Sequence, residues 1–179
     1  MIQKILCPTD LTVNSRESIA YGLSLARENR AQLIIFHATS FPCLARYPSH
    51  ELEHFREWDQ LVSKFKVDRV LAEAECKVKH FLHANFGIGC DGNSRKVRVG
   101  LGKVAEETLT AALREEVDII ILARRTKRAL SQLFTRSVSA TVSRSAPCPV
   151  VSIGSSRFIR RSALWRLTPL DEIDQRSQA

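Results

Sequence analysis

Hydrophobic and polar residues alternate along the chain between short apolar runs and stretches with helical spacing. The runs at residues 32–39 (QLIIFHAT) and 117–123 (VDIIILA) are almost continuously apolar, which is typical of parallel strands buried on both faces. Shorter runs at residues 2–10, 96–102 and 149–154 fit the same kind of strand. Five strands are therefore expected.

Helical patterns fall between these runs. Ile19, Leu23 and Ala26 recur at the spacing of one buried helical face, and Asn14 with Glu17 predicts a capping box at the start of that helix. Further helices are expected over residues 49–84 (with an interruption near residue 67), over 104–116 with Ala105, Leu109 and Ala112 inward, and over 137–145. This alternation predicts an α/β fold, a five-stranded parallel doubly wound sheet of Rossmann-like type. It should fill residues 1–154 as one domain, followed by a basic C-terminal tail over 155–179.

Composition fits a soluble domain. Of the 179 residues, 44% are hydrophobic and 26% charged, and no apolar run has the roughly 20 residues of a membrane helix. The first ten residues show no secretory signal, and the five cysteines are widely spaced and odd in number. We therefore expect a cytoplasmic protein with reduced thiols, and no membrane contact.

A net charge of +8 favours anionic partners, and much of it lies in one stretch. Residues 122–142 (LARRTKRALSQLFTRSVSATV) follow the fourth expected strand and contain no acid and no glycine. The five basic residues of this stretch are Arg124, Arg125, Lys127, Arg128 and Arg136. The stretch could hold a small anion, could be a phosphate site that has lost its glycines, or could be a solvated basic loop. Nucleic acid is not expected as a partner, because no nucleic-acid motif accompanies the charge.

Metal and catalytic sites are not expected. Cys76, His80 and His83 share one helical face, but Cys76 and His83 would lie about 10.5 Å apart along the axis, too far for one ion. Asp10 has no second acid, base or nucleophile beside it in the pattern, so no catalytic residue is assigned. Cys148, between two prolines, is expected to be a buried structural thiol.

Three stretches resemble the universal stress protein family: KILCPTDLTVNSRESI at residues 4–19, EVDIIILA at 116–123 and RSVSATVSRSAPCPVVSI at 136–153. The resemblance covers residues 1–154, is loose over 41–95 and does not extend to the tail. It implies the adenine-nucleotide alpha-hydrolase-like sheet with strand order 3-2-1-4-5. It also implies a homodimer through the last strand, at Val150, Val151, Ser152 and Ile153, where no charge discourages edge pairing.

The resemblance further implies a nucleotide site of which only half is present. Pro8 and Asp10 match positions that contact adenosine in binding members, and Ala38 matches a position lining adenine. Those members carry G-x2-G-x9-G-[ST] after the fourth strand, and its glycines align with Ala123, Thr126 and Arg136. The hydroxyl position is kept as Ser137. The candidate nucleotide or anion residues are Pro8, Asp10, Ala38, Ala123, Arg124, Arg125, Thr126, Arg128, Arg136, Ser137 and Val138.

Side chains at the three glycine positions should obstruct the family's ATP pose. A non-glycine residue in a left-handed conformation costs about 1–2 kcal/mol, and a Cβ keeps backbone N–H groups away from phosphate. Arginine–phosphate bonds can return about 1.5–3 kcal/mol each but cannot restore the shape of the loop.

We therefore expect a non-enzymatic universal-stress-type protein of the non-ATP-binding kind. It would act in stress response through dimerisation and through contacts with an unknown protein or a small anion, with no cofactor. The first alternative is an ATP- or AMP-binding switch with weak or no ATPase activity. The second is binding to nucleic acid or an acidic partner through the basic loop and tail.

Overall fold

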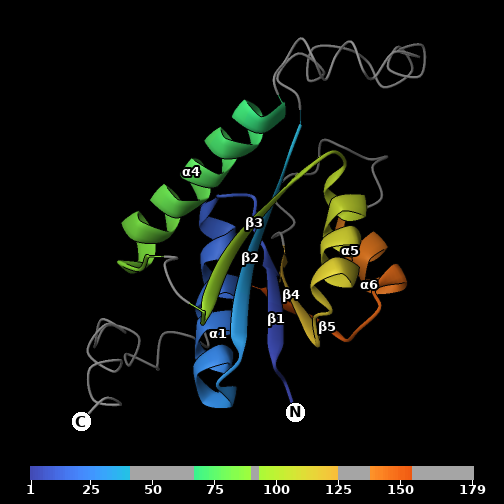
Figure 1. Ribbon diagram of the computed structural model, residues 1–179. Coiled ribbons are helices and arrows are strands. Elements are labelled where there is room, and N and C mark those ends of the chain that lie inside the picture. The colour runs from blue at the N-terminus through green and yellow to red at the C-terminus, as the bar shows by residue number, and fades with distance from the viewer. Residues whose placement is uncertain (41–66, 90–92, 125–137, 155–179) are drawn as a thin grey trace.

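The chain forms one parallel sheet with helices on both faces (Figure 1). The structure, a computed structural model, describes residues 1–40, 67–89, 93–124 and 138–154. Its strands are β1 (Lys4–Pro8), β2 (Gln32–Thr39), β3 (Arg95–Leu101), β4 (Ile119–Arg124) and β5 (Val150–Gly154). Their order is β3-β2-β1-β4-β5, and every neighbouring pair is parallel. The expected fold class and strand order are thereby confirmed.

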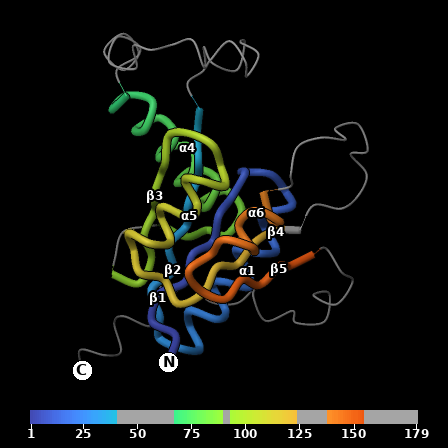
Figure 2. Tube along the Cα trace, turned by 90° about the vertical axis from the view of Figure 1, so that its right-hand side faces the viewer, coloured from blue at the N-terminus to red at the C-terminus, as the bar shows by residue number. Residues whose placement is uncertain are grey.

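Four helices are described: α1 (Val13–Asn29), α4 (Val67–Phe86), α5 (Val104–Glu115) and α6 (Val138–Ser145). Helices α1 and α4 cover one face of the sheet, and α5 and α6 cover the other (Figures 1 and 2). The expected helix over 49–84 is thus described only from Val67 onward, and it continues to Phe86. The last helix begins at Val138, while Ser137 lies outside the described residues.

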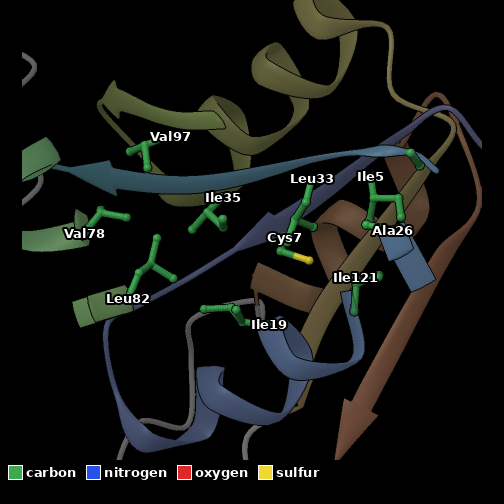
Figure 3. Packing of buried hydrophobic residues seen from close by; sticks show 11 residues of the cluster. Ile5, Cys7, Ile19, Ala26, Leu33, Ile35, Val78, Leu82, Val97 and Ile121 are labelled. Carbon is green, nitrogen blue, oxygen red and sulfur yellow. The ribbon is translucent and has the colours of Figure 1, made fainter. Parts of the chain in front are cut away.

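Two apolar clusters hold these layers together, one on each face of the sheet. Ile5, Leu33 and Ile35 pack toward α1 and α4 with Val78 and Leu82 (Figure 3). Strand residues of the opposite parity pack toward α5 and α6, as the period of two in a strand requires. Leu6, Ile34, Phe36, Ile120 and Val142 belong to this second cluster.

The first helix is capped two residues earlier than the sequence suggested. Thr12 is the N-cap, and its Oγ1 accepts a hydrogen bond from the Asn14 N–H at 3.3 Å. The predicted capping box at Asn14 and Glu17 is therefore wrong, because Asn14 already lies inside the helix. Threonine fills this position well, since its hydroxyl satisfies an N–H that would otherwise have no acceptor.

Other expected burial patterns hold in part. Ile19 and Ala26 are buried as predicted, whereas Leu23 is only half-buried. On α5, Ala112 is buried, but Ala105 and Leu109 are half-buried. Cys148 is also half-buried rather than buried. Its side chain packs against the α5–α6 cluster, and burial followed by the charge of Asp118 raises its pKa.

The two edge strands differ sharply in charge. β3 reads RKVRVGL, and two of its cations are paired with the end of α5: Lys96 Nζ lies 2.8 Å and Arg98 Nε 2.5 Å from the carboxylate of Glu115. β5 reads VVSIG and carries no charge. Charged side chains discourage edge-to-edge pairing, so only β5 has the composition of a strand that can pair with another chain.

Within the described ranges, no helix is long and apolar enough to cross a membrane.

Candidate functional site

The candidate site lies at the carboxyl edge of the sheet, where β1 and β4 are neighbours. The strand order reverses between these two strands, and ligands of doubly wound sheets bind at such a switch point. Pro8 ends β1, Ala38 is near the end of β2, and Ala123 and Arg124 end β4. The topology therefore brings these four predicted residues to one edge. Arg125, Thr126, Arg128, Arg136 and Ser137 lie outside the described residues, as does the tail over 155–179.

Asp10 is held within the loop that joins β1 to α1. Its Oδ1 accepts hydrogen bonds from the Thr12 N–H at 3.0 Å, from Thr12 Oγ1 at 2.6 Å and from Ser15 Oγ at 2.5 Å. The Asp10 N–H in turn donates to Ser15 Oγ at 3.1 Å. The resemblance implies a ligand contact for Asp10, but an aspartate after a strand can also cap its own loop, and the observed geometry is that of a loop cap.

Leu11 and Ser15 also shape this loop. Leu11 adopts a left-handed backbone, with φ of 58°, and Ser15 is buried beneath Asp10. Thr12 is a favoured type of cap residue, but Asp10, Asn14 and Ser15 are too, so the sequence alone did not single it out. The sequence does not indicate the left-handed backbone at Leu11, because leucine seldom adopts this conformation.

Near the end of β2, the backbone N–H and C=O of Ala38 face the space beyond the end of β1. Phe36 O accepts from the Thr9 N–H at 2.8 Å, so alternate residues of β2 face β1. Ala38 is the next residue of that parity, and among the described residues its N–H and C=O have no backbone partner on the β1 side. The Thr9 carbonyl is instead contacted by His37 Nδ1 at 2.8 Å. One donor and one acceptor are thus available beside each other at Ala38.

Ala123 occupies the first glycine position without backbone strain. It lies in β4, in register with Ile153, and the described non-glycine residues with positive φ are Leu11, Arg30 and Glu116. The cost that a left-handed backbone would carry therefore does not arise at Ala123. Its half-buried methyl group remains as extra volume at the edge. Val138, the first residue of α6, is 39% exposed there.

Cys76, His80 and His83 lie on α4, and all three are exposed. In the described part of the chain, no three His, Cys, Asp or Glu residues are grouped so that they could hold a metal. Cys76 and His80 instead line a cavity of about 450 Å³ between α4 and Leu11. The buried thiol of Cys7 lies in the core, where burial raises its pKa.

The sequence model of the universal stress protein family matches residues 1–153. The chain belongs to this family. The match covers almost all of the predicted domain over residues 1–154.

Solved structures share the fold. The hypothetical protein MJ0577 is 21% identical, with a TM-score of 0.59 over 88% of this chain and 99% of its own. The universal stress protein UspA from Lactobacillus plantarum is 18% identical, with a TM-score of 0.53 over 85% and 97% of the two chains. A universal stress protein in complex with cAMP is 17% identical, with a TM-score of 0.53 over 87% and 98%. A search of curated proteins found no match.

Proposed function

We propose that the protein is a non-catalytic universal-stress-type binding protein. It works as a homodimer in stress response, through contacts with a protein or a small anion, and it does not hold ATP in the extended pose of nucleotide-binding relatives. The observation that carries this proposal is the engagement of Asp10 as a loop cap, at a position that contacts adenosine in binding members.

A ligand that used the Asp10 carboxylate would have to share it with three donors. Two of these come from Thr12 and one from Ser15, and all lie within 3.0 Å of Oδ1. The carboxylate also places negative charge at the start of α1, where an unoccupied helix N-terminus would favour a phosphate. The first loop is therefore arranged to complete its own helix, and it disfavours an anion at that position.

The sequence of the second loop supports the same proposal. Ala123 adds a methyl group at the end of β4, and the other two glycine positions hold Thr126 and Arg136. A side chain at these positions keeps backbone N–H groups from approaching a phosphate chain closely. The five basic residues between 122 and 142 provide positive charge, but not the close backbone approach of a glycine loop. Such a stretch suits a small anion or an acidic protein surface better than a triphosphate.

The homodimer is supported by the contrast between the two edges of the sheet. β3 contains two arginines and a lysine, whereas β5 is short and uncharged and lies at the other edge of the sheet. A second copy of β5 is the partner that this edge fits best, because it would pair the remaining backbone groups of both strands.

A second candidate function is that of a nucleotide-binding switch for AMP or ATP, with weak or no ATPase activity. The available N–H and C=O of Ala38 favour it, since this pair complements the edge of an amino-substituted base. The likeness in fold to a protein solved in complex with cAMP is consistent with it.

Thermal unfolding with added ligand separates the two candidates. A ligand at about 100 times its dissociation constant stabilises the fold by about 2.7 kcal/mol, which gives a measurable rise in Tm. The first candidate predicts no rise with ATP, and a rise with ATP after Ala123, Thr126 and Arg136 are all replaced by glycine. A rise with AMP or cAMP in the parent protein would support the switch instead.

A further inference from the structure

A groove lies along α4 beside the β1–α1 loop, and its described lining residues have no part in the site above. Its volume is about 450 Å³, which is in the range of small-molecule pockets, and its lining is mainly apolar. One lining residue comes from the loop and six come from α4. They are Leu11, Cys76, Lys77, His80, Phe81, Ala84 and Asn85. The groove therefore has the size and the surface of a site for a small molecule with an apolar body.

The helical period of α4 makes one wall of this groove. Leu82 points from α4 into the core (Figure 3). A neighbouring face of the helix carries the residues at spacing i, i+3, i+4 and i+7, which are Lys77, His80, Phe81 and Ala84. From Lys77 to Ala84 this wall runs about 10.5 Å along the helix axis. The two basic residues thus lie toward one end of the wall, and the other end is apolar.

Leu11 contributes to the groove from the loop side. Its backbone is left-handed, with φ of 58°, and its half-buried side chain packs against the core cluster beneath α1 and α4. Glycine would adopt this conformation at lower cost, but it would supply no apolar side chain. Backbone strain of this kind is concentrated at functional sites and ligand clamps. The conformation of Leu11 therefore favours a binding role for the groove.

The polar residues of the groove select the charge of the ligand. Lys77 and His80 are exposed, and the described lining contains no Asp or Glu. Lys77 Nζ lies 3.1 Å from Glu73 Oε1, but the two side chains are 63% and 64% exposed. Such a pair contributes little, and an ammonium group has three donors, so Lys77 can also bind a ligand carboxylate. The groove thus favours an anionic group at the Lys77 end.

We propose that the groove along α4 binds a small amphipathic carboxylate. The apolar body packs against Leu11, Phe81 and Ala84, and the carboxylate accepts hydrogen bonds from Lys77 and His80. Burial of the apolar body supplies most of the affinity, while the charge-assisted hydrogen bonds fix the orientation and discriminate against neutral analogues. This site is independent of the function proposed for the sheet edge, because it uses none of the same residues.

The test titrates the full chain with octanoate, whose extended length matches the wall, and follows binding by calorimetry. Acetate tests the head group alone, and octanol tests the apolar body alone. The double variant Lys77→Gln/His80→Gln removes the basic groups of the groove. Its matched control is Lys79→Gln/His83→Gln, because these residues are exposed on the same helix and do not line the groove.

Two further variants test the apolar end of the groove. Ala84→Phe places a large side chain there, and Ala84 is exposed, so the core is not disturbed. Ala72→Phe is its control, because Ala72 is exposed on α4 and does not line the groove. The maleimide labelling rate of Cys76, located by peptide mass mapping, reports occupancy of the groove itself.

The parent should bind one octanoate per chain with a Kd below about 1 mM, and octanol and acetate at least about tenfold more weakly. Saturating octanoate should slow Cys76 labelling at least about threefold. Lys77→Gln/His80→Gln should weaken binding at least about tenfold, Ala84→Phe should abolish it, and both controls should bind as the parent does. No saturable binding, equal weakening by the two double variants, equal binding of octanol, or unchanged Cys76 labelling would overturn the proposal.

Discussion

The hydroxyl of Ser15 donates a hydrogen bond of 2.5 Å to Oδ1 of Asp10, and the same hydroxyl accepts from the Asp10 backbone N–H at 3.1 Å. Ser15 is buried, so this reciprocal pair fixes the exposed aspartate against the first turn of α1. A residue at a ligand-contacting position of the family thereby serves the fold. This relationship makes Asp10 part of the hydrogen bonding that holds the β1–α1 loop.

Replacing Asp10 with Ala should destabilise the protein by about 1–2 kcal/mol, because the acceptor for Thr12 and Ser15 in the loop before α1 is lost. Urea unfolding measures the change. The control is Asp68→Ala in the first turn of α4, where an exposed acid acts only through the helix dipole and should cost less than about 1 kcal/mol. Equal effects of the two substitutions would show that Asp10 is not a structural cap.

Gly22→Ala should destabilise the protein even though alanine favours helices. A Cβ at Gly22 would lie 2.5 Å from Cys7 Sγ and 3.1 Å from Leu33 Cδ1. Overpacking costs about 1–3 kcal/mol, which exceeds the gain in helix propensity of about 1 kcal/mol. Denaturant unfolding of Gly22→Ala, Cys7→Ala and the double variant should give a double-mutant loss smaller than the sum of the single losses. A Gly22→Ala protein as stable as the parent would show that this contact relaxes freely.

Glu115 should give the protein an acid-sensitive contribution to stability. Burial alone raises its pKa, but hydrogen bonds from Lys96 and Arg98, together with their charges, outweigh burial and lower it below the ordinary 4.5. A lowered folded pKa means that the stabilisation is present above pH 4.5 and is lost as the pH falls through the folded value. Glu115→Gln should therefore cost about 1–2 kcal/mol at neutral pH, with the deficit closing in acid.

The control for this prediction is Glu75→Gln, which removes an exposed pair with Lys79 on α4. Its effect on the free energy of unfolding should stay within about 0.5 kcal/mol at any pH. Chemical unfolding of both variants between pH 3 and pH 7 makes the comparison. A deficit for Glu115→Gln that is constant across this range would contradict the role of the carboxylate charge.

Much of the fold could be predicted because burial leaves a periodic signal. The near-continuous apolar run of residues 32–39 marked β2, and the run of residues 117–123 marked β4, since both faces of these strands are covered. The cap at Thr12 was missed because several short polar residues precede the first apolar turn. Any of them could have capped the helix until the backbone was known.

The site was harder to predict, because it depends on conformation rather than on periodicity. The alignment of Ala123 with a glycine suggested a strained backbone, yet the residue is ordinary strand. Asp10 could have faced a ligand or its own loop, and only the hydrogen bonds of Thr12 and Ser15 distinguish the two. The groove along α4 has no sequence signal, because it depends on how α4 lies relative to the loop at Leu11.

Removing one outward-facing backbone N–H from β5 tests the homodimer. In β5, the Ile120 N–H donates to Pro149 O, so residues 149, 151 and 153 face β4 and Ser152 faces the open edge. Ser152→Pro removes the outward N–H without removing a bond to β4. Light scattering at micromolar concentration should show a dimeric parent and a largely monomeric Ser152→Pro protein. Ser152→Ala keeps the N–H and should stay dimeric; a monomeric parent would exclude the dimer.

The central claim is that the family's ATP pose is lost in this chain. The most direct test is mass spectrometry of the nucleotide released when the purified, unmodified protein is denatured. The account predicts no ATP above a small fraction of the protein concentration. Recovery of about one ATP per chain, at the tight occupancy expected of a nucleotide-holding relative, would contradict it.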